Sequence, residues 1–99
     1  MVKIIKLVDS PLKSKRFRVY LNDGKHFDFG LKNGETYIDH HNTDKRFNYQ
    51  KRHYNSKKEQ PYIQNLVASS ALFSYYLLWG KSTSIKTNII HLNKLFKNV

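Results

Sequence analysis

The sequence has no cysteine, two prolines, four glycines and only seven acidic residues in 99. Without cysteine, neither a disulfide nor a thiolate zinc site can stabilise the fold. Residues 1–8 lack the apolar run and cleavage site of a signal peptide. The most apolar stretch, residues 66–79, is too short for a membrane-spanning helix and contains three serines. These absences predict a chain without a membrane span, whose fold depends on its own apolar core.

Basic residues dominate the charge of the chain. Eighteen Lys and Arg against seven Asp and Glu give a formal net charge of +11 at pH 7, and fourteen aromatic residues (seven Tyr, six Phe, one Trp) run along the whole length. A disordered basic tail would be poor in aromatics, so the charge belongs to a folded surface. Such a surface attracts polyanions, nucleic acid first, with anionic lipid or an acidic protein as alternatives. A solvated basic surface that docks to protein is the competing interpretation.

The length allows one domain, residues 1–99. Residues 2–30 predict antiparallel strands, because apolar and β-branched residues alternate with polar ones and turn residues interrupt them. Three helices are expected after the strands, over residues 43–55, 61–79 and 83–97. The predicted fold class is therefore α+β, with an N-terminal antiparallel β-hairpin or three-stranded meander packed on two or three α-helices.

The hairpin register follows from which residues must share a face of the sheet. A two-residue Asp23-Gly24 loop would mix apolar and polar partners. A three-residue loop, Asn22-Asp23-Gly24, with Gly24 in the left-handed conformation, keeps the faces separate. This loop predicts three cross-strand pairs: Val19 with Phe27, Phe17 with Phe29, and Arg18 with Asp28.

The apolar pattern also predicts the core. Pro61 is placed to begin the second helix and Gly80 to end it, while apolar residues in the last helix recur at intervals of four, three and four. We expect Trp79 to be a core plug, although stacking on a nucleobase is an alternative if it is exposed. The expected core comprises Val19, Leu21, Phe27, Phe29, Leu66, Phe73, Leu77, Ile85, Ile89, Leu92 and Phe96.

The middle segment carries the densest polar chemistry. Thr43 is the expected cap of the helix over residues 43–55, and Phe47 and Tyr54 are expected to anchor it to the core. The opposite face, with Lys45, Asn48 and Arg52, suits a helix that lies along a phosphate backbone, or equally a solvated helix.

Histidines in this segment raise the question of catalysis. The string Asp39-His40-His41-Asn42, together with His53, is loosely similar to the start of an HNH nuclease motif, in which a histidine activates water beside a divalent metal. The hairpin and the further ligand that such a site needs are not apparent, and two histidines without thiolates are a weak zinc signal. We therefore expect no catalytic residues, no metal site and no cofactor, with an HNH-like nuclease as a remote alternative.

If the chain binds nucleic acid, the contacts fall on basic residues of the first loop, the hairpin and the middle helix. Lysines and arginines there would contact phosphates, largely without reading the base sequence. The candidate residues are Lys13, Lys15, Arg16, Arg18, Lys45, Arg46, Lys51, Arg52, Lys57 and Lys58.

The order of signals along residues 15–96 resembles a known family. The motifs are Lys15-Arg16-Phe17-Arg18-Val19, Asp23-Gly24-Lys25-x-Phe27-Asp28-Phe29-Gly30, Tyr37-Ile38-x-His40-His41, Arg46-x-x-Tyr49-x-x-Arg52-His53 and Ser74-x-x-Leu77-Leu78-Trp79-x-Lys81. In this order they are similar to a family of small basic uncharacterised proteins from nucleocytoplasmic large DNA viruses, the giant viruses. The resemblance implies a viral context and no catalytic activity.

In that context two roles are open. The first is a non-enzymatic virion protein that binds the viral duplex DNA non-specifically; the second is a minor capsid protein that fastens the shell from inside. Capsid docking would use the hairpin edge and exposed aromatics such as Tyr20, Tyr75 and Tyr76. The resemblance places the protein in the virion, or in the virus factory in the host cytoplasm or nucleus.

Overall fold

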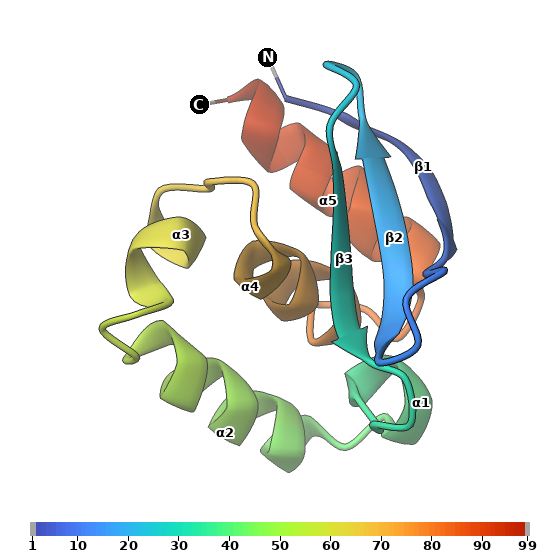
Figure 1. Cartoon of the computed structure of the whole chain (residues 1–99). Coiled ribbons are helices and arrows are strands. Elements are labelled where there is room, and N and C mark those ends of the chain that lie inside the picture. The colour runs from blue at the N-terminus through green and yellow to red at the C-terminus, as the bar shows by residue number, and fades with distance from the viewer. Residues whose placement is uncertain (1, 99) are drawn as a thin grey trace.

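Figure 1 shows the fold, a computed structural model that describes residues 2–98. A three-stranded sheet comes first and the helices follow, so the predicted α+β class is confirmed. The strands are β1 (Ile4–Asp9), β2 (Lys15–Leu21) and β3 (His26–Leu31). The helices are α1 (Tyr37–His40), α2 (Thr43–Tyr54), α3 (Gln60–Gln64), α4 (Ser70–Phe73), the π-helical turn η1 (Ser74–Leu78) and α5 (Ile85–Lys97).

The sheet is an antiparallel meander in the order β1-β2-β3. The predicted hairpin register is confirmed, because Val19 pairs with Phe27, Phe17 with Phe29, and Arg18 with Asp28. Gly24 adopts the expected left-handed conformation, with φ of 86°, which a residue with a Cβ rarely adopts. The three-residue loop thus sets which side chains face the helices.

The core lies between one face of the sheet and the segment from α4 to α5. In Figure 1, α5 runs behind the sheet and α4 lies beside β3. Seven of the predicted core residues are buried, namely Val19, Leu21, Phe29, Phe73, Leu77, Leu92 and Phe96. Four others, Phe27, Leu66, Ile85 and Ile89, are partly buried and pack against them.

The prediction of one helix over residues 61–79 is wrong. The chain forms α3, leaves the helix at Leu66 with a left-handed φ of 52°, and re-enters at α4. Ser69 is extended and its hydroxyl accepts a hydrogen bond from the backbone N–H of Leu72, which starts the new helix. Serine competes for backbone hydrogen bonds in this way, and the apolar pattern does not reveal the competition.

The expected cap of one helix and the expected start of another shift by one and two residues, respectively. Asn42, rather than Thr43, caps α2, and its side chain accepts a hydrogen bond from the N–H of Lys45. Ser84 caps α5, so the helix expected over residues 83–97 begins at Ile85. Each cap supplies an acceptor for an otherwise unpaired N–H in the first turn.

The segment between η1 and α5 is fixed by one buried polar side chain. The Asn88 amide donates to the carbonyls of Leu77 (3.0 Å) and Ser82 (2.8 Å), and its oxygen accepts from the N–H of Ser82. Gly80 packs so closely here that a Cβ would lie 2.1 Å from the carbonyl oxygen of Tyr76. The backbone around Trp79 and Gly80 therefore has one well-defined course.

A second asparagine joins the first and last elements. The Asn93 side chain of α5 accepts a hydrogen bond from the N–H of Ile4 (2.8 Å) and donates to its carbonyl (3.1 Å). Ile4 lies in β1, an edge strand of the sheet. The side-chain amide thus takes the place of a neighbouring strand at this residue, which protects part of the edge.

Replacing Asn88 tests this view of the segment. We expect Asn88→Ala to lower the free energy of unfolding by roughly 2 to 4 kcal/mol, because the buried carbonyl of Leu77 loses its partner and Ser82 loses two hydrogen bonds. Urea unfolding followed by circular dichroism measures the change. The control is Asn48→Ala, at an exposed position of α2, where we expect a change within about 0.5 kcal/mol. Equal stability of the two variants would contradict the assignment.

Candidate functional site

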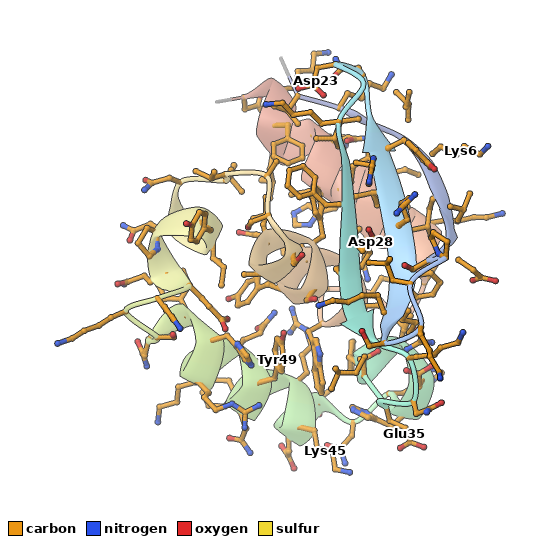
Figure 2. All side chains as sticks on the ribbon, in the orientation of Figure 1. Lys6, Asp23, Asp28, Glu35, Lys45 and Tyr49 are labelled. Carbon is orange, nitrogen blue, oxygen red and sulfur yellow. The ribbon has the colours of Figure 1, made fainter. Side chains whose placement is uncertain are left out.

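Helix α2 contacts the rest of the molecule through polar and aromatic side chains. Arg46, Tyr49, Gln50 and His53 share its inner face, at the spacing of residues on one side of a helix. Figure 2 shows Tyr49 on this side. The expected anchor Phe47 instead points to solvent with 65 % of its surface exposed, and Tyr54 is exposed too. The predicted inner face was therefore wrong, since hydrogen bonds and ring stacking outweigh apolar burial here.

The inner face of α2 converges on Trp79. The Trp79 and Tyr49 rings are stacked with centroids 4.2 Å apart and planes inclined by 5°, and His53 stacks on Tyr49 at 4.0 Å. The carbonyl of Trp79 accepts from Gln50 Nε2 (2.8 Å) and from Arg46 Nε (3.2 Å). Arg46 Nε also donates to the carbonyl of Gly80 at 2.6 Å. Trp79 is a packing residue, as expected. Its backbone carbonyl also accepts hydrogen bonds that attach α2.

His53 and Glu59 form an imidazole–carboxylate pair. His53 Nδ1 lies 2.5 Å from Glu59 Oε2, and both side chains are partly exposed. A carboxylate at Nδ1 favours the tautomer with the proton on that nitrogen, which leaves Nε2 as an acceptor in the neutral ring. Burial, and then the Glu59 charge, raise the pKa of Tyr49 well above its usual value, so its phenol stays protonated.

These side chains border a groove between α2, the end of β3 and the segment from α4 to Trp79. The groove has a volume of about 430 Å³. Lys15 and Arg52 lie on its lining, together with the His53–Glu59 pair and Glu35. The lining also includes Ser70, Ser74, Leu31, Ala71 and Leu78, beside Tyr49 and Trp79. The structure thus brings two of the predicted site residues, Lys15 and Arg52, to one cavity.

The string Asp39-His40-His41-Asn42 has a local structural role throughout. Asp39 accepts from the backbone and side chain of Thr36 in a capping box at the start of α1. His40 Nδ1 accepts from the N–H of Asn42, and its ring contacts Trp79. His41 ends α1 in the left-handed conformation. The residues that suggested an HNH motif are signals that end one helix and begin the next.

Three of the four predicted arginine contacts are engaged within the fold. Arg16 makes a bidentate ion pair with Asp39, with both distances 2.7 Å. Arg18 pairs with Asp28 at 2.9 and 3.1 Å across neighbouring strands. Hydrogen bonds from these arginines hold the pKa of each carboxyl below its usual value. Arg46 bonds to the two carbonyls described above, so these three arginines are structural.

The predicted lysines remain free of acidic partners. The ion pairs among residues 2–98 involve Arg16, Arg18 and His53, and none involves a lysine. Most of the predicted lysines are exposed, with Lys15 partly so. We use the name α2 ridge for the exposed residues on the outer face of α2 and in the turn after it: Lys45, Asn48, Lys51, Arg52, Lys57 and Lys58.

The features above define a small basic α+β domain with a polar groove and a lysine-rich outer helix. Over residues 5–53 the chain is similar to a family of unknown function, DUF5754. That range covers the sheet except Ile4, α1 and α2 almost to its end, and it stops before Glu59 and Trp79. Searches of curated proteins and of solved structures each gave no match.

Two further observations concern residues 2–98. No three or more His, Cys, Asp or Glu side chains in this range are grouped so that they could hold a metal ion. Every helix in the range falls short of the length and apolar character needed to cross a membrane.

The polar attachment of α2 predicts how the helix responds to mutation. We expect Arg46→Ala to release α2 locally, because Nε loses its bonds to the carbonyls of Trp79 and Gly80. Hydrogen exchange should then speed up at least about tenfold in α2 and remain nearly unchanged in β2. Lys45→Ala, at the neighbouring exposed position, is the control and should leave the exchange of both elements unchanged. Equal exchange of α2 in both variants would contradict the attachment.

The two arginine–aspartate pairs predict acid sensitivity. Asp28 and Asp39 have lowered pKa values in the folded state, so they stabilise it fully above the ordinary Asp pKa of about 4 and lose that contribution as pH falls further. Urea unfolding between roughly pH 7 and pH 2 should show this fall. The Asp28→Asn, Asp39→Asn double variant should be less stable at neutral pH and show a shallower fall. Asp9→Asn, at an exposed residue, is the control and should lose stability with falling pH as steeply as the unmodified protein. If the control shows a fall as shallow as that of the double variant, the assignment is refuted.

Proposed function

We propose that the protein is a non-enzymatic DNA-binding protein that contacts duplex phosphates non-specifically, with the α2 ridge as its principal contact surface. The observation that carries the proposal is the lysine charge left without acidic partners. Duplex DNA carries a condensed layer of counterions, and each lysine that neutralises a phosphate releases some of them, which drives association.

The position of the ridge supports this role. Helix α2 lies at the periphery of the molecule (Figure 1), and its inner face attaches to Trp79 and Gly80. Lys45 and Lys51 are exposed on this helix, and Arg52 is exposed at its border with the groove. Lys57 and Lys58 continue the charge into the next turn. Because phosphates lie along a line, cations gathered on one helix and the turn after it can contact several of them.

The chemistry of the cations supports binding without base readout. Sequence-specific contacts in the major groove commonly use the bidentate guanidinium of arginine against guanine. Arg16, Arg18 and Arg46 are committed to partners within the fold, and lysine, a compact point charge, suits phosphates. A protein with this division of charge is expected to bind many sequences with similar affinity.

The resemblance to small basic proteins of giant viruses gives the proposal a setting. In that setting the protein is associated with the virion and acts on the viral genome, in the particle or in the virus factory of the host cytoplasm or nucleus. A role as a minor capsid or shell-fastening protein is the alternative. The aromatics proposed for it, Tyr20, Tyr75 and Tyr76, are partly buried and engaged in ring contacts, which favours the DNA-binding role.

A salt series with random-sequence duplex DNA tests the proposal. We expect affinity to fall steeply with salt, and the Lys45→Gln, Lys51→Gln double variant to flatten the slope of log K against log salt by up to about 1.8, for two lost phosphate contacts. The control is the Lys86→Gln, Lys94→Gln double variant, which removes the same charge from exposed positions of α5 and should retain most of the slope. Absence of binding at low salt would overturn the proposal. Equal effects of the two variants would refute the ridge as the contact surface.

A further inference from the structure

The groove beside α2 has the size and lining of a ligand site. Its volume of about 430 Å³ lies within the range of small-molecule and cofactor pockets. Strand β2, helix α2 and the segment from α4 to Trp79 all contribute to it, so the complete fold forms it. One wall contains the π-helical turn η1, closed by the hydrogen bond from the N–H of Trp79 to the carbonyl of Ser74. Such turns are rare in proteins overall, but many of those that occur lie at functional sites.

The charged groups of the groove leave a place for an anion. Lys15, the first residue of β2, and Arg52, near the end of α2, both lie on its lining, and neither pairs with an acid among residues 2–98. Glu59 is already paired with His53. Glu35 is therefore the single carboxylate of the lining without an ion-pair partner, against two cations. A phosphate group that contacts both cations would form charge-assisted hydrogen bonds with each of them.

The rest of the lining suits a planar, partly polar group. The rings of Tyr49 and Trp79 form a stack at one side, and the partly exposed Ala71 provides apolar surface. The Ser74 hydroxyl, which has no hydrogen-bond partner among the described residues, and Nε2 of His53 offer polar atoms. Nucleobases combine an apolar face with donors and acceptors at the edge, and they favour aromatic surroundings.

We propose that this groove binds a nucleotide, with the phosphate between Lys15 and Arg52 and the base against Ala71 beside the Tyr49–Trp79 stack. The nucleotide is either a free nucleoside monophosphate or the unpaired terminal nucleotide of a nucleic acid strand. Apart from Arg52, the residues that carry this proposal lie outside the α2 ridge. The groove can therefore bind a nucleotide whether or not the ridge binds duplex DNA.

Exposed cations outside both proposed surfaces provide a matched control. The groove variant carries Lys15→Gln and Arg52→Gln, and the control carries Lys25→Gln and Lys86→Gln, at exposed positions outside the lining and outside the α2 ridge. Both variants lose two positive charges. Titration of the full chain with nucleoside 5′-monophosphates at low salt should show saturable binding, weakened at least about tenfold in the groove variant and less than about twofold in the control. Thermal melting should show that both variants fold.

Two outcomes of this titration would overturn the proposal. The first is wild-type protein that shows no saturation at millimolar nucleotide. The second is equal weakening in the two variants, which would mean that nucleotides respond only to the overall charge.

Duplexes with different ends distinguish the two sources of the nucleotide. If the groove takes a strand end, a duplex with a one-nucleotide overhang should bind more tightly than a blunt duplex, and the groove variant should lose this preference while the control retains it. If the groove takes a free nucleotide, the two duplexes should bind equally while the monophosphate saturates. Nucleotide binding without any duplex binding would refute the DNA-binding proposal and support the groove.

Discussion

The carbonyl groups of Trp79 and Gly80 are the acceptors on which the placement of α2 depends. No residue of α2 is buried, so apolar packing contributes little to holding this helix. Its attachment comes from Arg46 and Gln50, which donate to those carbonyls, and from the Tyr49 ring on Trp79. Asn88 in turn fixes the course of the backbone on either side. One buried amide in α5 thus determines where α2 lies, and with it the walls of the groove and the direction of the ridge.

The division of labour between arginine and lysine follows from their chemistry. A guanidinium can make two parallel hydrogen bonds in a fixed plane, which suits the carboxylates of Asp28 and Asp39. Arg46 instead shares its Nε–H between the adjacent carbonyls of Trp79 and Gly80. Lysine carries a compact and strongly hydrated charge. When it loses water to form an ion pair, it gains fewer fixed hydrogen bonds in return than arginine does. The arginines consequently make hydrogen bonds and ion pairs within the fold. The lysines supply positive charge at the surface, and this explains why a chain with so many cations can still form a specific fold.

Sequence-based prediction was most accurate where apolar and polar residues alternate regularly within one short segment, so that each falls on its own face of a strand or helix. The hairpin register followed from the alternation in β2 and β3 and from the one residue, Gly24, that favours the left-handed turn. The last helix was predictable for the same reason, since its apolar period is regular over three turns.

Prediction failed where polar side chains override apolar patterning. Ser69 caps a new helix inside what looked like a continuous one, and Asn88 and Asn93 replace backbone partners across long sequence distances. The spacing of Arg46, Tyr49, Gln50 and His53 shows that they share one face of α2. Because these residues are mostly polar, the sequence does not distinguish a face that packs inward from one exposed to solvent. The hydrogen-bond partners of this face, Glu59, Trp79 and Gly80, lie beyond residue 58, so the groove could not be anticipated from the middle segment alone.

The Asn93 bond to Ile4 has a consequence for synthesis of the protein. The two residues are separated by 89 positions, so β1 has no partner at this edge until α5 has been made. Until then the core beneath the sheet also lacks its α5 residues, Leu92 and Phe96. Contacts of such separation close slowly and late. A nascent chain on the ribosome therefore presents an unfinished apolar sheet, and final folding takes place after α5 emerges from the exit tunnel.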